Sequence, residues 1–171
     1  MQADFHHGLI RRYYEELWNS WNFAVAHDLL TEDIVFQGSL GVSVRGMPAF
    51  LSYMRQVQAA FLDFHNTLED TAVESDKVFA RLSYRGTHRG ELFGIPPTNQ
   101  NITYSGAAFF TICAGKICRG WVLGDALGVL RQLEGASSRH SEALNGMRLE
   151  ITPAGSGDCE WAASRRSLSR A

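Results

Sequence analysis

The sequence predicts an α+β fold in which three N-terminal helices pack in a curved antiparallel sheet and form a cone. Apolar residues recur every three to four positions as far as about residue 61, and every second position from about residue 66. The period therefore changes once, from that of a helix to that of a strand. Helices followed by antiparallel strands are typical of the α+β class, and a length of 171 residues suits one domain.

The helices are expected before residue 62. The first has an apolar stripe over residues 9–18, and Asp4 is its expected N-cap. A short second helix begins near Asn22, and a short strand follows at residues 34–36. The third begins near Met47, with Pro48 in its first turn, where proline is tolerated. The apolar faces of the first and third helices are Leu9, Ile10, Tyr13, Tyr14, Leu17 and Trp18, and Phe50, Tyr53, Met54, Val57, Ala60 and Phe61.

Four strands are expected after the helices, at residues 66–74, 78–88, 101–113 and 117–125. Asp76-Lys77, the loop around Pro96-Pro97 and a turn at Gly115 separate them. A helical turn at residues 126–133 closes the core of a domain that spans residues 1–133. Residues 134–171 are rich in Ser, Arg, Gly and Ala, which predicts an appended tail of low order.

The composition argues against several classes of partner. Sixteen Lys and Arg residues against eighteen Asp and Glu give a net charge of −2, which does not favour nucleic-acid binding. The longest apolar stretch, at residues 107–114, is too short to cross a membrane. The N-terminal residues lack the pattern of a secretory signal. We therefore expect a soluble, cytoplasmic protein that binds neither nucleic acid nor membrane.

The three cysteines are too few for a disulfide framework. Cys113 and Cys118 flank a hairpin turn. If Gly115-Lys116 is the two-residue loop, the cysteines face each other; if Ala114-Gly115 is the loop, Cys113 faces Lys116 instead. We expect reduced, packed cysteines. The histidines are scattered along the chain, so no metal site is predicted.

Several segments together resemble a known family. They are Tyr13-Tyr14-Glu15-Glu16-Leu17-Trp18-Asn19, the run from Phe61 to Asp70, the run from Gly86-Thr87-His88 to Gly94-Ile95-Pro96-Pro97-Thr98, and Asp125 to Leu130-Arg131-Gln132-Leu133. Over roughly residues 8–133 the chain resembles the SnoaL-like polyketide cyclases, also called the ester cyclase family. The resemblance implies the cone-shaped fold of nuclear transport factor 2 and ketosteroid isomerase. It also implies a homodimer through the sheet face, where Trp121 and Leu123 would point outward.

The resemblance further implies a cofactor-free enzyme. Such cyclases close a ring by an intramolecular aldol reaction, in which a carbon acid loses a proton and the enolate attacks a carbonyl. An aspartate directly after the position of Trp121 moves the proton, and a histidine on the preceding strand lies beside it. This sequence has Val122 and Ala108 at those positions. Phe36 and Gln37 likewise stand where relatives often carry polar residues. Because valine cannot exchange a proton, catalysis would rest on other residues or on substrate conformation.

Strand alternation predicts which residues face the pocket. If Val122 points inward, Gly120 and Gly124 share its face, and Ala108 brings Tyr104, Gly106 and Phe110 inward on the neighbouring strand. The glycines would leave room for a bulky hydrophobic ligand; alternatively, the third helix packs closely against them. The expected substrate-binding residues are Tyr14, Trp18, Tyr53, Phe36, Ala108, Phe110 and Val122.

Three residues are candidates for proton transfer. His88 titrates nearest neutral pH, but it could equally anchor its loop. Tyr104 places a hydroxyl at one end of the apolar wall. Asp125 is the carboxylate nearest in sequence to position 122, although alternation puts it on the opposite face and it is well placed to cap the terminal helical turn.

Three functions are consistent with these residues. The leading hypothesis is a cyclase or isomerase that acts on a hydrophobic polyketide-like or terpenoid-like molecule in a secondary-metabolic pathway. The second is a non-catalytic protein that kept the pocket for binding. The third is an epoxide-opening enzyme with a displaced carboxylate, for which only Glu69 or Asp70 is available.

Overall fold

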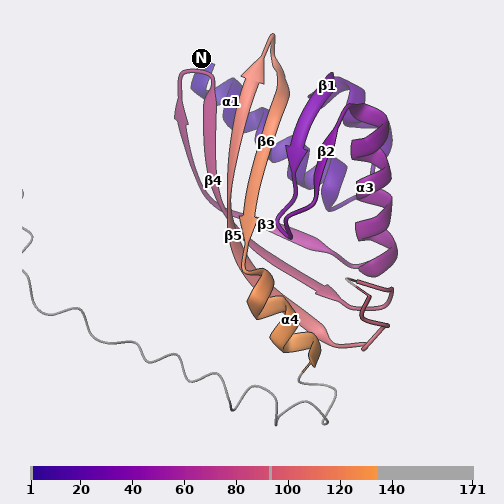
Figure 1. The fold of residues 1–171 in the computed structure, drawn as a ribbon. Coiled ribbons are helices and arrows are strands. Elements are labelled where there is room, and N and C mark those ends of the chain that lie inside the picture. Colours follow the sequence, from indigo (N-terminus) through magenta and orange to yellow (C-terminus); the bar gives the residue numbers. More distant parts are fainter. Residues whose placement is uncertain (1, 93, 135–171) are drawn as a thin grey trace, which may run out of the picture. The chain divides into compact units, whose positions relative to one another are not determined.

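A single six-stranded sheet organises the computed structural model, which describes residues 2–92 and 94–134. The strand order is β2-β1-β6-β5-β4-β3 (Figure 1). The tail expected over residues 134–171 lies, apart from Glu134, outside the described residues. The strands are β1 (Leu30–Gln37), β2 (Ser43–Arg45), β3 (His65–Glu74), β4 (Lys77–Thr87), β5 (Asn101–Cys113) and β6 (Lys116–Gly124).

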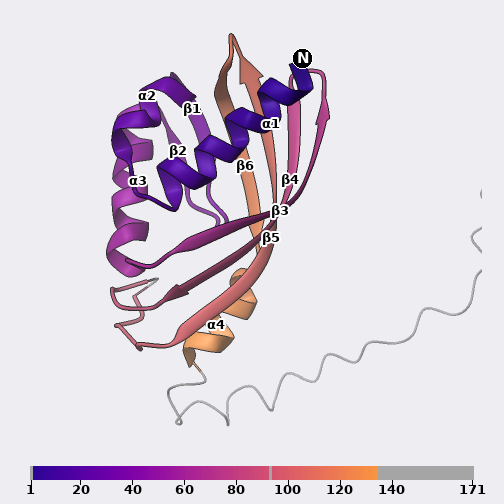
Figure 2. The ribbon, with the colours of Figure 1, turned by 180° about the vertical axis from the view of Figure 1, so that it is seen from behind.

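The helices precede, interrupt and follow the sheet. Seen from behind, α1 lies across the strands, and α2 and α3 lie beside it (Figure 2). Asp4 lies inside the first turn of α1 rather than at the cap, and Pro48 starts α3 as expected. Among the described residues, no helix is long and apolar enough to cross a membrane. The helical segments are α1 (Gln2–Arg12), the π-helix η1 (Tyr13–Trp18), the 3-10 turn η2 (Phe23–Val25), α2 (Ala26–Leu29), α3 (Met47–Ala60) and α4 (Ala126–Glu134).

The predicted α+β class is confirmed, with one difference in the sheet. The long strands β3 to β6 pair in antiparallel register as the alternation predicts. The strand expected at residues 34–36 is longer and pairs in parallel with β6, so that Phe36 lies opposite Gly120. The short strand β2 was not predicted. A parallel pair needs a long connection between its strands, and more than seventy residues separate β1 from β6.

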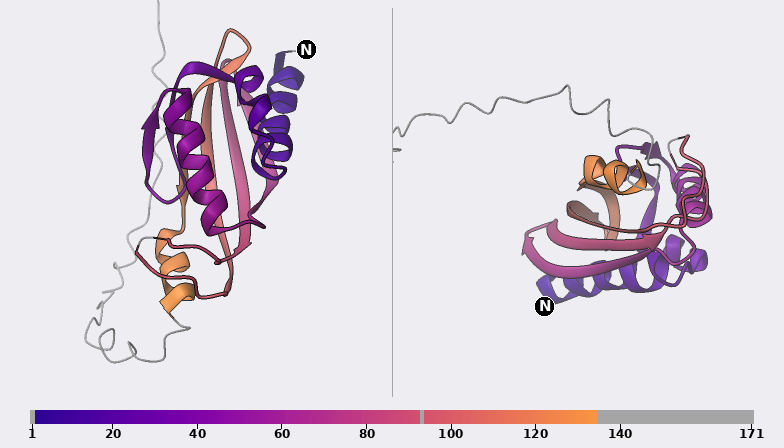
Figure 3. Two further views of the ribbon diagram at one scale, coloured as in Figure 1. Left: turned by 90° about the vertical axis from the view of Figure 1, so that its right-hand side faces the viewer. Right: turned by 90° about the horizontal axis from the view of Figure 1, so that it is seen from below.

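Side chains alternate between a buried and an exposed face of the curved sheet, whose bend is visible end-on in Figure 3. On β6, Val122 is buried, whereas Trp121 and Leu123 are 41 % and 56 % exposed. The paired strand β5 places Tyr104, Ala108 and Phe110 on the buried face. The predicted inward and outward sets on these two strands are therefore confirmed.

The terminal helix α4 covers a free strand edge. Because β6 ends at Gly124, the first residues of β5 have no partner strand on that side. The side-chain amide of Gln132 takes the place of one: its oxygen accepts the Thr103 N–H at 2.9 Å, and its nitrogen donates to the Thr103 carbonyl at 2.8 Å. Gln132, part of the Leu-Arg-Gln-Leu ending, thus satisfies an edge that would otherwise be open.

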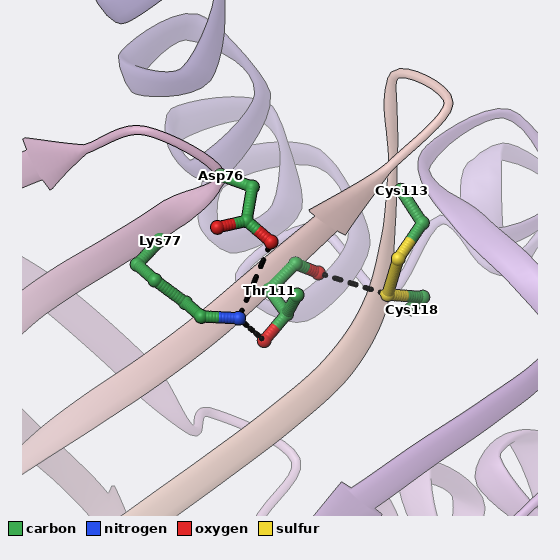
Figure 4. The surroundings of a disulfide bond; sticks show 5 residues. All are labelled: Asp76, Lys77, Thr111, Cys113 and Cys118. Carbon is green, nitrogen blue, oxygen red and sulfur yellow. Dashed lines mark hydrogen bonds and ion pairs between the residues drawn. A yellow bond between two sulfur atoms is a disulfide. The ribbon is translucent and has the colours of Figure 1, made fainter.

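The expectation of reduced cysteines is wrong in this structure, where a disulfide joins Cys113 and Cys118. Ala114 and Gly115 form the turn, both with positive φ, so Cys113 pairs with Lys116 in the ladder. The register shifts just beyond Ile112, which leaves Cys118 as the extra residue of a β-bulge. The bulge redirects the Cys118 side chain toward Cys113, beside Thr111 (Figure 4). Simple strand alternation cannot anticipate this.

Candidate functional site

An enclosed cavity lies between the helices and the buried face of the sheet. Its volume is only about 40 Å³. That space holds a few water molecules at most. The lining residues are Tyr13, Tyr14, Trp18, Phe36, Ser39, Leu40, Tyr53, Val57, Phe61, Phe64, Asn66, Tyr84, Leu92, Tyr104 and Val122.

The π-helix supplies three of these side chains. A π-helix turns once in more than four residues, and the Asn19 N–H accordingly donates to the Tyr14 carbonyl, five residues back, at 2.8 Å. The wider turn lets Tyr13, Tyr14 and Trp18 all face inward, and each is buried. The apolar stripe was visible in the sequence, but its change of pitch was not.

The cavity approaches the surface between two loops and the second half of α3. Leu40, Val57 and Leu92 are the half-buried apolar members of its lining. The loop that carries Leu92 is fastened to the end of α3, where the N–H groups of Arg89 and Gly90 both donate to the Ala60 carbonyl. A Cβ at Gly90 would collide with the Ala59 carbonyl, so only glycine allows this close approach.

The room expected at the sheet glycines is already filled by the protein's own side chains. A Cβ at Gly120 would lie 2.7 Å from the Phe36 ring, and one at Gly106 would lie 2.9 Å from the Tyr84 ring. A Cβ at Gly124 would meet Ser39 at 2.8 Å and Tyr104 at 3.0 Å. The sequence analysis expected either room for a ligand or close packing of the third helix at these glycines. Both expectations are wrong for these positions. The Phe36 and Tyr84 rings and the backbone carbonyls of Ser39 and Leu123 occupy the glycine surfaces, and a bulky ligand enters only if side chains such as Phe36 move.

Four polar groups on the cavity wall have no hydrogen-bond partner: the hydroxyls of Tyr13, Tyr14 and Tyr84, and the indole nitrogen of Trp18. All four side chains are at most 5 % exposed. An unsatisfied buried polar group costs about 1–3 kcal/mol, and native proteins contain few of them. By contrast, the Tyr104 hydroxyl lies 3.0 Å from the Ser39 hydroxyl and is satisfied.

The cavity contains no group that acts as a base at neutral pH. No charged residue of the described chain lines it. Burial raises the pKa of Tyr53 to about 12. Burial also raises the pKa of Tyr14 well above its ordinary value, and the nearby Tyr84 adds to this rise. Burial raises the pKa of Tyr84 and of Tyr104 as well. The hydroxyls therefore stay protonated and act as hydrogen-bond donors.

His88 lies behind the cavity wall. It is fully buried, and its ring packs against Phe61, with ring centres 5.6 Å apart. The Thr98 N–H donates to its Nδ1 at 3.3 Å, and the Thr98 hydroxyl lies 3.0 Å from the same atom. The proton of the neutral ring is therefore on Nε2. Burial lowers the pKa of His88. His88 and Thr98, the two ends of the glycine- and proline-rich loop motif, hold that loop together.

Of the other site residues predicted from the sequence, some line the cavity and some lie outside it. Asp125 is exposed outside the cavity and accepts the Gly128 N–H at 2.8 Å, which caps α4. Ala108 is buried opposite Val122 but is not part of the lining, and Phe110 packs behind Tyr13 and Tyr14. The candidates that do line the cavity are Tyr14, Trp18, Phe36, Tyr53, Tyr104 and Val122.

Several cavity residues were not among the site residues predicted from the sequence, including Ser39, Leu40, Asn66 and Tyr84. The inward position of Tyr84 could be predicted, because strand alternation puts it on the same face of β4 as Leu82. No pattern in the sequence marks Asn66 as a cavity residue, because its position depends on a residue far away in the chain. The side-chain oxygen of Asn19 accepts the Asn66 backbone N–H at 2.8 Å. The carboxylates required for epoxide opening, Glu69 and Asp70, are both exposed outside this cavity.

Comparison with known proteins agrees with this fold and identifies a family. The family model described as SnoaL-like polyketide cyclase matches residues 8–133. A protein from Jannaschia sp. CCS1, provisionally named a SnoaL-like polyketide cyclase, is 19 % identical with a TM-score of 0.71, over 77 % of this chain and 92 % of its own. TsrD from Streptomyces laurentii is 24 % identical with a TM-score of 0.69, over 76 % and 95 %. IdmH from Streptomyces antibioticus, provisionally named a polyketide cyclase, is 27 % identical with a TM-score of 0.65, over 74 % and 96 %. No curated protein is significantly similar in sequence.

Proposed function

Because the chain belongs to the SnoaL-like polyketide cyclase family, we propose that it is a cofactor-free cyclase or isomerase of a hydrophobic polyketide-like or terpenoid-like molecule in a secondary-metabolic pathway. The observation that carries the proposal is the enclosed aromatic cavity with unpartnered hydrogen-bond donors on its wall. Once side chains such as Phe36 move aside, a cavity of this kind would bind an apolar chain that carries a few oxygen atoms.

Catalysis in this proposal rests on positioning. The family's acidic residue is replaced by Val122, and the described cavity offers no other carboxylate. The aromatic wall would hold the substrate chain bent, with its reacting atoms in contact and water excluded. Positioning of this kind can lower a barrier by roughly 7 kcal/mol or more. The substrate would react as its enol, whose carbon attacks the carbonyl while its hydroxyl proton passes to the new alkoxide, so the step needs no protein base. A tyrosine hydroxyl would donate a hydrogen bond to the carbonyl oxygen that gains negative charge during ring closure. Of the proposed proton-transfer residues, Tyr104 alone lines the cavity, and we keep it in this role.

Ring closure of a linear polyketone tests the proposal. The purified protein is incubated with the polyketone, and the cyclic product is followed by its absorbance and mass. We expect closure faster than in buffer, and a slower rate for Tyr104→Phe. The variant Val122→Asp/Ala108→His, which returns the family's acid and histidine, serves as the comparison. If neither the wild-type protein nor this variant exceeds the rate in buffer, the cyclase proposal fails.

A second candidate function is binding without turnover. It is favoured by the apolar pair Val122 and Ala108, which face each other across β5 and β6 where the family places its proton-transfer pair. A binder would be stabilised against heat by the polyketone or its cyclic product, yet leave the polyketone unchanged. Thermal unfolding and product formation measured on the same samples therefore distinguish the two functions.

We also propose that the protein forms a homodimer through the exposed face of the sheet. Phe79, Phe109 and Trp121 form an edge-to-face row there, with ring centres 5.0 and 5.4 Å apart, and Leu123 is 56 % exposed. Light scattering after size exclusion should give twice the chain mass. Trp121→Glu should give the monomer, whereas Leu62→Glu, which changes another exposed apolar residue away from the sheet, should not. A monomeric wild-type protein would contradict the proposal.

The proposed location is the cytoplasm. The Cys113–Cys118 disulfide points the other way, because persistent disulfides are rare in cytosolic proteins. Thiol titration of protein purified under non-reducing conditions from its native cells decides between them. A cytoplasmic protein should give three free thiols, one for each cysteine of the chain.

A further inference from the structure

The unpartnered polar groups of the described chain are concentrated in one place. Of seven buried side-chain atoms without a partner, four belong to residues that line the cavity. The other three, in His6, Thr31 and His88, belong to residues outside its lining. A random scatter of packing defects would not favour the lining of this cavity. The cluster therefore calls for a ligand.

The inference rests on two of the four groups, the hydroxyls of Tyr14 and Tyr84. The indole N–H of Trp18 is close enough to lower the pKa of Tyr13, although burial outweighs this effect. The Tyr13 hydroxyl and the Trp18 indole N–H thus lie near each other, although no hydrogen bond joins them. Tyr14 on η1 and Tyr84 on β4 have no such neighbour. Their hydroxyls come from opposite walls, one from the helical layer and one from the sheet.

Ring packing holds both hydroxyls in place. Tyr84 is stacked between Phe64 and Tyr104, with ring centres 5.9 and 4.5 Å away. The Tyr14 ring meets Tyr13 and Phe110 edge-on, at 5.0 and 6.1 Å. A ring fixed on its sides cannot swing its hydroxyl toward a partner elsewhere in the protein. The two donors are thus preorganised toward the cavity.

We propose that Tyr14 and Tyr84 are the specificity-determining residues of this cavity, and that each donates a hydrogen bond to an oxygen atom of a neutral ligand. A ketone or hydroxyl oxygen fits the site because no Lys or Arg of the described chain lines the cavity to neutralise a carboxylate. The inference rests on the proposed function only in that the cavity takes a hydrophobic molecule. It adds that the molecule is uncharged and carries an oxygen atom within reach of these two hydroxyls.

The test compares two probes of one skeleton, α-tetralone, a neutral ketone, and tetralin, its hydrocarbon. Binding to the full-length protein is followed by tryptophan fluorescence, since Trp18 lines the cavity. The wild-type protein should bind the ketone more tightly than the hydrocarbon. Tyr84→Phe or Tyr14→Phe should reduce this preference about tenfold, the usual effect of losing one hydrogen bond, and leave tetralin binding unchanged.

Thermal stability of the unliganded variants gives an independent readout. Removing an unsatisfied hydroxyl should leave the Tm unchanged or raise it. Tyr104→Phe, which breaks the bond to Ser39, should lower the Tm and serves as the comparison. Loss of stability in Tyr14→Phe and Tyr84→Phe equal to that in Tyr104→Phe would overturn the proposal, as would a wild-type protein with no preference for the ketone. A ketone preference without ring-closing activity would refute the cyclase and leave this inference standing.

Discussion

Replacing Val122 by aspartate should create a protein whose stability falls as pH rises. Val122 is 5 % exposed, and no charged residue of the described chain lines the cavity it faces. A carboxylate placed there would be buried without a countercharge, and burial of that kind raises an Asp pKa by up to about 3–5 units. The hydroxyls of Tyr14 and Tyr84 can donate to it, so we take the lower figure of about 3 units.

The expected magnitude follows from that shift. Each pKa unit corresponds to about 1.4 kcal/mol, so about 3 units cost about 4 kcal/mol once the pH exceeds the raised pKa. The penalty is absent below the ordinary Asp pKa of about 3.9, because the carboxyl is then protonated in both states. It grows as pH rises from there and levels off above the folded-state pKa. Loss of the valine side chain adds about 2 kcal/mol that does not depend on pH.

Urea unfolding from pH 5 to pH 8 measures this effect. Val122→Asn is the matched control, because it has nearly the same shape and no charge. The free energy of unfolding of Val122→Asp should fall relative to Val122→Asn by about 1.4 kcal/mol per pH unit at the steepest point. Parallel pH dependences for the two variants would refute the reasoning, since position 122 would then be in contact with solvent or with a cation.

Two further predictions concern the proton-transfer candidates outside the cavity. Asp125→Ala should lower the free energy of unfolding by about 1 kcal/mol, because α4 loses its cap, and should leave ring closure unchanged; a loss of ring closure would show a catalytic role instead. Burial lowers the pKa of His88 in the folded protein. As pH falls below about 6.5, His88 is therefore protonated in the unfolded chain before it is protonated in the folded one. The free energy of unfolding should decrease over this range, down to the folded-state pKa. His88→Gln, which can still accept from Thr98, should weaken this dependence in urea unfolding between pH 7.5 and 5; an unchanged dependence would contradict the assignment.

Local patterns in the sequence were enough for most of the fold. Alternation along β5 and β6 predicts that Val122 and Tyr104 face inward and Trp121 outward, because neighbouring side chains of a strand must point to opposite faces. Pro48 marks the start of α3 for an equally local reason, its fixed φ. The cavity wall could be foreseen in part from the same patterns.

The parallel pairing of β1 with β6 and the contents of the cavity depend on segments far apart in the chain. The bulge at Cys118 is local to a hairpin, but strand alternation does not reveal it. The sequence alone determined that positions 108 and 122 carry the apolar residues Ala and Val. Only the tertiary structure decided that Phe36 fills the space at Gly120 and that Tyr104 finds Ser39 while Tyr84 finds no partner. The physical reason is that a side chain's direction is set by its own strand or helix, whereas packing and hydrogen-bond satisfaction are set by whatever other elements bring within reach.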